Sequence, residues 1–184
     1  MAAFFDRLNE KHIAFIERQP MFFVASAAAD GRINLSPKGM DTFRVLDAAT
    51  VAYLDLTGSG NETAAHIKRD GRVTVMLNSF DKVPLILRLY GRGRVAAMGS
   101  AEFAAHKDRF PDLPGARQII FVDIDSVQTS CGYAVPEMAL IAERQVLVQS
   151  TLAKGEEGLR NYQREKNMTS IDGFETGLVV ADHK

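Results

Sequence analysis

The chain has 184 residues, of which 46% are apolar and 24% charged, and its formal net charge is −1. These are ordinary values for a globular protein, and we expect one domain over residues 1–184. The near-neutral charge excludes a general attraction to nucleic acid or to an anionic membrane. No apolar run approaches the ~20 residues that span a bilayer.

Two further features predict a cytoplasmic protein. The single cysteine, Cys131, cannot form an internal disulfide, which fits a reducing compartment. A signal peptide is not predicted at the N-terminus, because charged residues occur early there and the apolar stretch is too short. Cys131 has no histidine nearby in sequence to activate it, so an inert cysteine is favoured over a reactive thiol.

The N-terminal residues place apolar side chains at helical spacing. The pattern predicts an amphipathic helix over residues 1–20 that ends near Pro20. His12 lies on the apolar stripe, so we interpret it as a core or half-buried histidine and not as a catalyst. The apolar positions are Phe4, Phe5, Leu8, His12, Phe15 and Ile16.

Residues 21–128 are dominated by strand patterns. Asp30-Gly31 predicts a hairpin turn. Because proline cannot donate to the ladder, Pro37 indicates that the chain here lies at a sheet edge or leaves the sheet. Gly91 and Gly93 interrupt a long strand and predict a bend or bulge, which favours an antiparallel sheet that curls into a barrel. The expected strands cover residues 21–28, 32–36, 43–46, 50–56, 72–78, 85–97 and 117–128.

One stretch is central to this arrangement. It consists of a strand, a glycine-rich turn and the start of a helix. Residues 51–56 are apolar, residues 57–61 are small and polar, and residues 62–69 are helical in pattern. Glycines let backbone approach a ligand closely, and a helix start presents free N–H groups that favour an anion. Ser59 or Asn61 is a candidate N-cap, and Ser59 with Glu62 matches a capping box. A capped helix without a ligand is the alternative.

Two helical regions are expected after the long strand. Residues 100–108 suit a short helix with Ser100 as its N-cap. Residues 137–170 form a predicted C-terminal helical segment, interrupted near Gly155, and residues 171–180 are expected to dock loosely. His66 follows the glycine turn, where a ligand contact and a structural role are equally supported.

The sequence lacks the motifs of chemistry carried by side chains. It holds no CxxC, no HExxH, no other cluster with metal-ligand spacing, no G-x-S-x-G elbow and no Walker A loop. We therefore expect no metal site, and the catalytic residues stay unassigned. If the protein is an enzyme, a cofactor is expected to carry the chemistry.

Several short motifs, in this order, resemble the pyridoxamine 5'-phosphate oxidase-like family of FMN-binding split barrels. They are Leu35-Ser-Pro-Lys-Gly39, Tyr53-Leu-Asp55, Gly58-Ser-Gly-Asn-Glu-Thr63, Gly71-Arg-Val73 and Leu87-Arg-Leu-Tyr-Gly91. The resemblance runs from about residue 22 to residue 128. It is greatest to an uncharacterised branch that also carries Cys-Gly-Tyr-x-Val-Pro, here at residues 131–136.

The resemblance implies a mainly β fold with flanking helices, built on a six-stranded antiparallel split β-barrel over residues 21–128. It implies a homodimer with FMN at the subunit interface and a small-molecule substrate. The flavin would lie against residues 36–38, with its phosphate near residues 57–63. Carried over by position, the cofactor-binding residues are Leu35, Ser36, Lys38, Leu54, Asp55, Thr57, Gly60, Asn61, Glu62, Thr63 and Arg88.

The sequence departs from the family pattern at several positions, and these departures argue against the reaction of the oxidases. The oxidases place Ser-Arg-Lys before the central helix, where this chain has Asn61-Glu62-Thr63, so phosphate binding must depend on main-chain N–H groups and hydroxyls, with Lys38, Arg88 or Arg92 as possible cations. The segment that holds the oxidases' substrate phosphate has no counterpart between residues 105 and 117. Oxidation of pyridoxamine phosphate is therefore not expected.

Three functions remain open on the sequence. The first is an FMN-dependent oxidoreductase of unknown substrate, with hydride transfer at flavin N5. The second is a non-catalytic flavin or haem carrier or sensor on the same scaffold, in which His12, His66 or His106 would have to be the haem ligand. The third is a dimeric barrel without a ligand.

Overall fold

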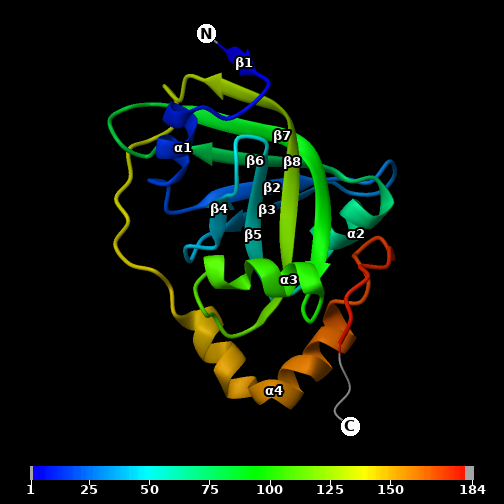
Figure 1. The fold of residues 1–184 in the computed structure, drawn as a ribbon. Coiled ribbons are helices and arrows are strands. Elements are labelled where there is room, and N and C mark those ends of the chain that lie inside the picture. Colours follow the sequence, from blue (N-terminus) through cyan, green and yellow to red (C-terminus); the bar gives the residue numbers. More distant parts are fainter. Residues whose placement is uncertain (1, 181–184) are drawn as a thin grey trace.

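The computed structural model describes residues 2–180, which fold around one curled antiparallel sheet (Figure 1). Neighbouring strands follow the order β3-β2-β6-β7-β8-β5-β4, and β1 pairs with β8 off this path. The strands are β1 (Ala3–Phe5), β2 (Phe22–Ser26), β3 (Asn34–Lys38), β4 (Phe43–Val45), β5 (Thr50–Leu56), β6 (Arg72–Asn78), β7 (Ile86–Ala97) and β8 (Ala116–Ser130). The mainly β split-barrel fold is as predicted.

The strand count differs from the six that the family resemblance implies. Within residues 2–180 the sheet has eight strands, not six. The short β1 and β4 add to it because each finds an unpaired stretch of a longer strand, β1 along β8 and β4 along β5.

The two longest strands, β7 and β8, give the sheet its curvature. Their register shifts between Tyr90 and Gly91, which confirms the predicted bulge. A Cβ on Gly91 would lie 2.1 Å from the carbonyl oxygen of Asp123, so no side chain fits at this crossing. Apolar side chains from five strands then meet in the main core, among them Val24, Val51, Val75, Leu87 and Ile120.

The helices lie around the sheet. They are α1 (Glu10–Ile16), α2 (Glu62–Arg69), α3 (Ala101–His106) with a 3₁₀ turn, η1 (Lys107–Arg109), after it, and α4 (Val146–Lys166). The range of α2 matches the expected helix. Ser100 caps α3 by accepting a hydrogen bond from the N–H of Phe103, as predicted. No helix within residues 2–180 is long and apolar enough to cross a membrane.

The helix predicted over residues 1–20 is wrong at both ends. Phe4 and Phe5 belong to β1, whose ladder with β8 satisfies backbone groups that an isolated first turn would leave free. The helix begins only at Glu10, after Asn9 accepts a hydrogen bond from the N–H of His12, and it ends at Ile16. His12 is buried, as predicted.

The C-terminal segment also differs from its prediction. Residues 137–145 are irregular, and α4 begins at Val146. The apolar side chains that suggested an earlier helix, on Leu140 and Ile141, are exposed, so no packed face supports a helix there. Gly155, at a φ of 63°, kinks α4 at the predicted interruption.

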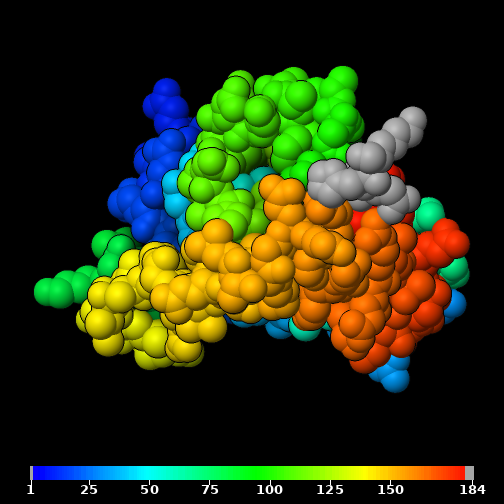
Figure 2. Space-filling model, turned by 90° about the horizontal axis from the view of Figure 1, so that it is seen from below, coloured from blue at the N-terminus to red at the C-terminus, as the bar shows by residue number. Residues whose placement is uncertain are grey.

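Residues 167–178 are packed and not loosely docked. Thr169 and Glu175 form a β-bridge, and the side chains of Ser170, Thr176 and Leu178 are buried. In Figure 1, α4 crosses below the sheet and this last segment rises beside α2. The view from below shows α4 spread across that end of the molecule, with α3 next to it (Figure 2).

Candidate functional site

A cavity of about 300 Å³ opens where β3, the end of β5 and the glycine turn (residues 57–61) meet. The strands β3 and β5 are not neighbours in the sheet, so its curling brings them together. The edge position predicted from Pro37 is confirmed, because β3 is an end strand. The cavity is lined by Asn34, Ser36, Pro37, Lys38, Asp55, Leu56, Gly58, Ser59, Gly60, Asn61, Glu62, Thr63 and Arg117.

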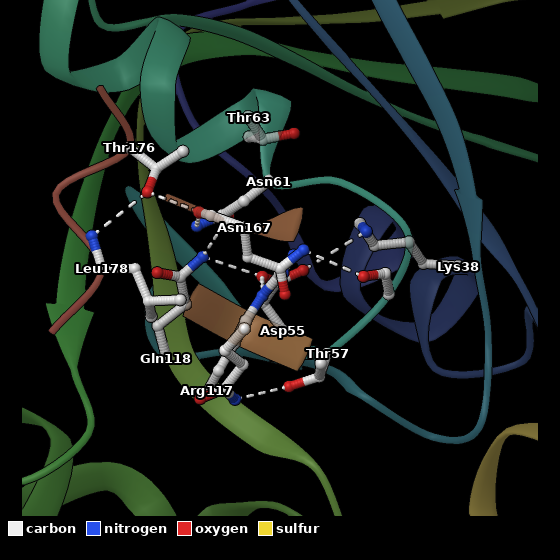
Figure 3. Close-up of polar contacts among 12 residues, drawn as sticks. Lys38, Asp55, Thr57, Asn61, Thr63, Arg117, Gln118, Asn167, Thr176 and Leu178 are labelled. Carbon is white, nitrogen blue, oxygen red and sulfur yellow. Dashed lines mark hydrogen bonds and ion pairs between the residues drawn. The ribbon is translucent and has the colours of Figure 1, made fainter. Parts of the chain in front are cut away.

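Asp55 is the centre of a buried polar cluster at the floor of this cavity (Figure 3). Its carboxylate accepts hydrogen bonds from Arg117 Nε at 2.7 Å and from Gln118 Nε2 at 2.8 Å, and Lys38 Nζ lies 3.4 Å away. Gln118 Nε2 also donates to Asn61 Oδ1 at 2.8 Å, which ties the cluster to the glycine turn.

The electrostatics of the cluster favour a charged Asp55. Burial raises the pKa of this carboxyl, but the positive charges of Arg117 and Lys38, with hydrogen bonds from Arg117 and Gln118, more than offset it and the pKa is lowered. One carboxylate thus faces two cations. These three groups together carry one net positive charge, which is balanced by Glu62, the other carboxylate that lines the cavity.

Several donors near the cavity have no hydrogen-bond partner among the described residues. Arg117 Nη1 is buried and has no hydrogen-bond partner among the described residues. The main-chain N–H groups of Ser59 and Gly60 make no hydrogen bond within that same part of the chain. Together with the start of α2, these groups suit an anion.

The backbone conformation of the turn does not require glycine at either of its two glycine positions. Neither Gly58 nor Gly60 has a positive φ. A Cβ on Gly58 would come no nearer than 4.0 Å to another atom, the carbonyl oxygen of Leu56, so the space beside it is open. Glycine here leaves room for a ligand against the backbone, which fits a phosphate group held by main-chain donors.

Most residues predicted for the cofactor site line this cavity, namely Ser36, Lys38, Asp55, Gly60, Asn61, Glu62 and Thr63. Leu35 is exposed on the adjacent face of β3, Leu54 is buried in a second apolar core, and Thr57 is buried beneath the turn. Arg88 donates to Ser130 Oγ at 3.0 Å and does not line the cavity of this chain.

The predicted capping box is wrong. Asn61 is the N-cap of α2, but its side chain makes no capping bond. That side chain instead accepts from Gln118 and donates to the carbonyl oxygen of Asn167 at 3.5 Å. The carboxylate of Glu62 accepts from the N–H of Ile171, at 3.1 and 3.2 Å, so tertiary partners replace the local cap.

Sequence reasoning missed five polar residues of the site. They are Asn34, Arg117, Gln118, Gln163 and Asn167. Arg117 and Gln118 carried a signal, because these two long polar side chains directly precede the apolar run at residues 119–122 in the same strand, which is fully buried. Gln163 and Asn167 carried none, since each stands in a polar stretch that resembles a solvated helix face.

The three histidines within residues 2–180 do not line the cavity. His12 Nδ1 accepts from the N–H of Asn9, the N-cap of α1, and His66 is buried with its Nδ1 3.0 Å from Ser26 Oγ. His106 contacts the carbonyl oxygen of Glu102 in its own helix. Within residues 2–180, no group of three or more metal-ligating side chains comes together.

The chain is similar to known proteins in sequence and in fold. The family model described as pyridoxamine 5'-phosphate oxidase matches residues 8–131. A protein of Aspergillus flavus, "pyridoxamine 5'-phosphate oxidase family protein ustO", is 38% identical over 194 residues, covering 95% of this chain and 77% of its own length.

Two solved structures share the fold at lower identity. A candidate pyridoxamine 5'-phosphate oxidase from Lactobacillus delbrueckii has a TM-score of 0.54 at 20% identity, covering 67% of this chain and 94% of its own. HupZ from Group A Streptococcus has a TM-score of 0.51 at 19% identity, covering 65% of this chain and 91% of its own. Residues 132–184 lie outside the range that the family model matches.

Proposed function

The chain belongs to the pyridoxamine 5'-phosphate oxidase family, and from this premise we propose that it binds FMN and oxidises or reduces a small molecule with it. The observation that carries the proposal is the cavity beside the glycine turn, which combines free main-chain N–H groups with two cationic side chains, Lys38 and Arg117. A phosphate monoester is the anion that such an arrangement suits.

The residues of the cavity fit the two ends of this cofactor. The N–H groups of Ser59 and Gly60 and the hydroxyl of Thr63 would hold the phosphate, and Ser36 and Lys38 would face the flavin. Bound FMN supplies a ring that accepts and returns hydride at N5, chemistry that the side chains of this protein lack. Lys38, held by Asp55, provides a fixed positive charge where reduction adds negative charge.

We propose a homodimer with the cofactor between its subunits. The cavity of about 300 Å³ is at the low end for a ligand pocket, so one chain would cover only part of FMN. Ile33 and Leu35, 78% and 64% exposed, flank it on the β3 edge and would suit contact with a second subunit. Light scattering should give twice the chain mass, and a monomer that binds FMN at full affinity would contradict this arrangement.

The substrate is proposed to be a small molecule other than pyridoxamine phosphate. The segment between α3 and β8, where the oxidases hold their substrate phosphate, has no Ser-Arg-x-x-x-Ser-Gln pattern in this chain. Turnover of pyridoxamine phosphate at a rate typical of enzymes would contradict this part of the proposal.

The absorption spectrum of freshly purified protein tests the cofactor directly. We expect flavin bands, or saturable quenching of FMN fluorescence when the cofactor is added to apoprotein. A colourless protein that does not bind FMN would refute the proposal. A Soret band would indicate haem instead, for which no histidine within residues 2–180 lines the cavity.

One observation favours a flavin carrier without turnover as the second candidate. Asp55, the buried carboxylate at the cavity, is engaged by two cations that lower its pKa, so it is poorly suited to take up a substrate proton. Anaerobic mixing of the flavin form with reduced nicotinamides separates the two functions. Reduction at a useful rate supports the oxidoreductase, and its absence across donors supports the carrier.

A further inference from the structure

We propose that residues 163–176, here called the C-terminal clamp, position the glycine turn so that its N–H groups are preset for the cofactor phosphate. The proposal rests on the function proposed above and deepens it. It assigns a role in cofactor binding to a segment that lies outside the range matched by the family model.

The clamp holds the first half of the turn. Gln163 Nε2 donates to Thr57 Oγ1 at 2.8 Å, and Asn167 Nδ2 donates to the carbonyl oxygen of Gly58 at 3.0 Å. The acceptor on Gly58 is main chain, so the second bond fixes the orientation of the peptide unit that leads into Ser59.

The clamp also holds the end of the turn. Asn61 Nδ2 donates to the carbonyl oxygen of Asn167, and the N–H of Ile171 donates to the carboxylate of Glu62. Ser59 and Gly60, whose N–H groups are free, therefore lie between two anchored ends.

The clamp is a built structure and not a chance contact. Asn167 is 0% exposed, and its carbonyl oxygen also accepts from Thr176 Oγ1 at 2.7 Å. The N–H of Thr176 donates to the carbonyl oxygen of Met168 at 3.0 Å, which closes the segment on itself. Figure 3 shows Asn167 reaching from the end of α4 into the centre of the site, beside Asn61 and Asp55.

The physical need for such a clamp follows from the composition of the turn. Asn61-Glu62-Thr63 supplies no cation, so the phosphate depends on main-chain donors in a segment with two glycines. A glycine-rich turn left free would lose much conformational entropy on binding, and a turn held in advance loses little. Preorganisation by the clamp thus takes the place of cationic side chains.

Paired flavin titrations test the clamp, because riboflavin is FMN without its phosphate. Asn167→Ala and Gln163→Ala are compared with Glu157→Ala, an exposed position of the same helix, by fluorescence titration with both flavins. We expect the FMN dissociation constant to rise about fivefold to tenfold in the two clamp variants, the effect of one lost hydrogen bond, with riboflavin affinity unchanged. The control variant should match wild type with both ligands.

Amide hydrogen exchange gives a second readout that needs no flavin. Peptides spanning residues 55–64 should exchange faster in Asn167→Ala than in wild type or Glu157→Ala, while those from β7 stay protected. Equal loss of FMN and riboflavin affinity, or unchanged FMN affinity, would overturn the clamp. Wild-type protein that binds neither flavin would instead refute the proposed function. If Asn167→Ala does not fold, the FMN and riboflavin titrations of Gln163→Ala, which lies at the edge of the network, test the clamp.

Discussion

Lys38 Nζ lies 3.4 Å from Asp55 Oδ1, although β3 and β5 are separated by four other strands in the order of the sheet. The ion pair therefore spans the split of the barrel. Its carboxylate is also the partner of the buried Arg117, so the contact that closes the sheet is continuous with the floor of the candidate site.

Asp55→Asn should be strongly destabilising. The substitution removes the negative charge but leaves Arg117 buried, and an unpaired buried cation costs about 3–5 kcal/mol. Chemical denaturation with urea measures the loss, with Asp125→Asn, at an exposed position of β8, as the matched control. A loss below about 1 kcal/mol would mean that water reaches Arg117 and solvates it.

The same carboxyl predicts a loss of stability in acid. Burial acts to raise the pKa of Asp55, but Arg117 and Lys38 lower it below the ordinary 3.8. A carboxyl whose pKa is depressed by folding contributes stability above its unfolded pKa and loses it as pH falls through the folded value. The melting temperature of the wild-type protein should therefore decrease as the pH is lowered below 3.8. Asp55→Asn should not show the part of this decrease that comes from protonation of Asp55.

Local patterns were sufficient to predict most of the elements. Asp30-Gly31 and Asp70-Gly71 mark turns with short-range chemistry, and both glycines take a positive φ of 89°. The helix over residues 62–69 was predicted with its observed bounds. Period-two apolar patterns likewise located the long strands, because one face of each must be buried.

The polar floor of the site could not be predicted in this way. Asp55 and Arg117 are 62 positions apart, and they meet only because the register of β5 on β8 places Asp55 opposite Gln118. Gln163 reaches Thr57 across 106 positions. Such contacts depend on register and on the docking of α4, neither of which leaves a signal in a single sequence.

Gly58→Ala should separate cofactor binding from folding. The backbone at Gly58 has no positive φ, and an added Cβ meets no atom nearer than 4.0 Å, so the melting temperature should change little. The methyl group would stand where the phosphate approaches the turn, and FMN affinity should fall about tenfold or more. An unchanged FMN dissociation constant would place the phosphate away from this turn.

Glu62→Gln should strengthen FMN binding. The carboxylate lines the cavity and repels a phosphate dianion, and glutamine keeps an oxygen that can accept from the N–H of Ile171. We expect the FMN dissociation constant to fall roughly threefold at low salt, with the gain shrinking as salt screens the charge. Riboflavin serves as the uncharged control. Weaker FMN binding would show that the carboxylate supports the turn and does not oppose the ligand.

Lys38→Met should change the redox behaviour of bound flavin as well as its affinity. The side chain is partly buried, with 23% of its area exposed, and its charge is held in place by Asp55, so methionine removes the charge while keeping much of the apolar stem. Reduction adds negative charge to the flavin, and losing a nearby cation should lower the two-electron potential by about 30 mV, equivalent to a tenfold change in the equilibrium.

Lys82→Met, at an exposed position in the loop between β6 and β7, is the control. Spectroscopic titration against a reference dye measures both variants, and a potential unchanged in Lys38→Met would place the flavin ring away from β3.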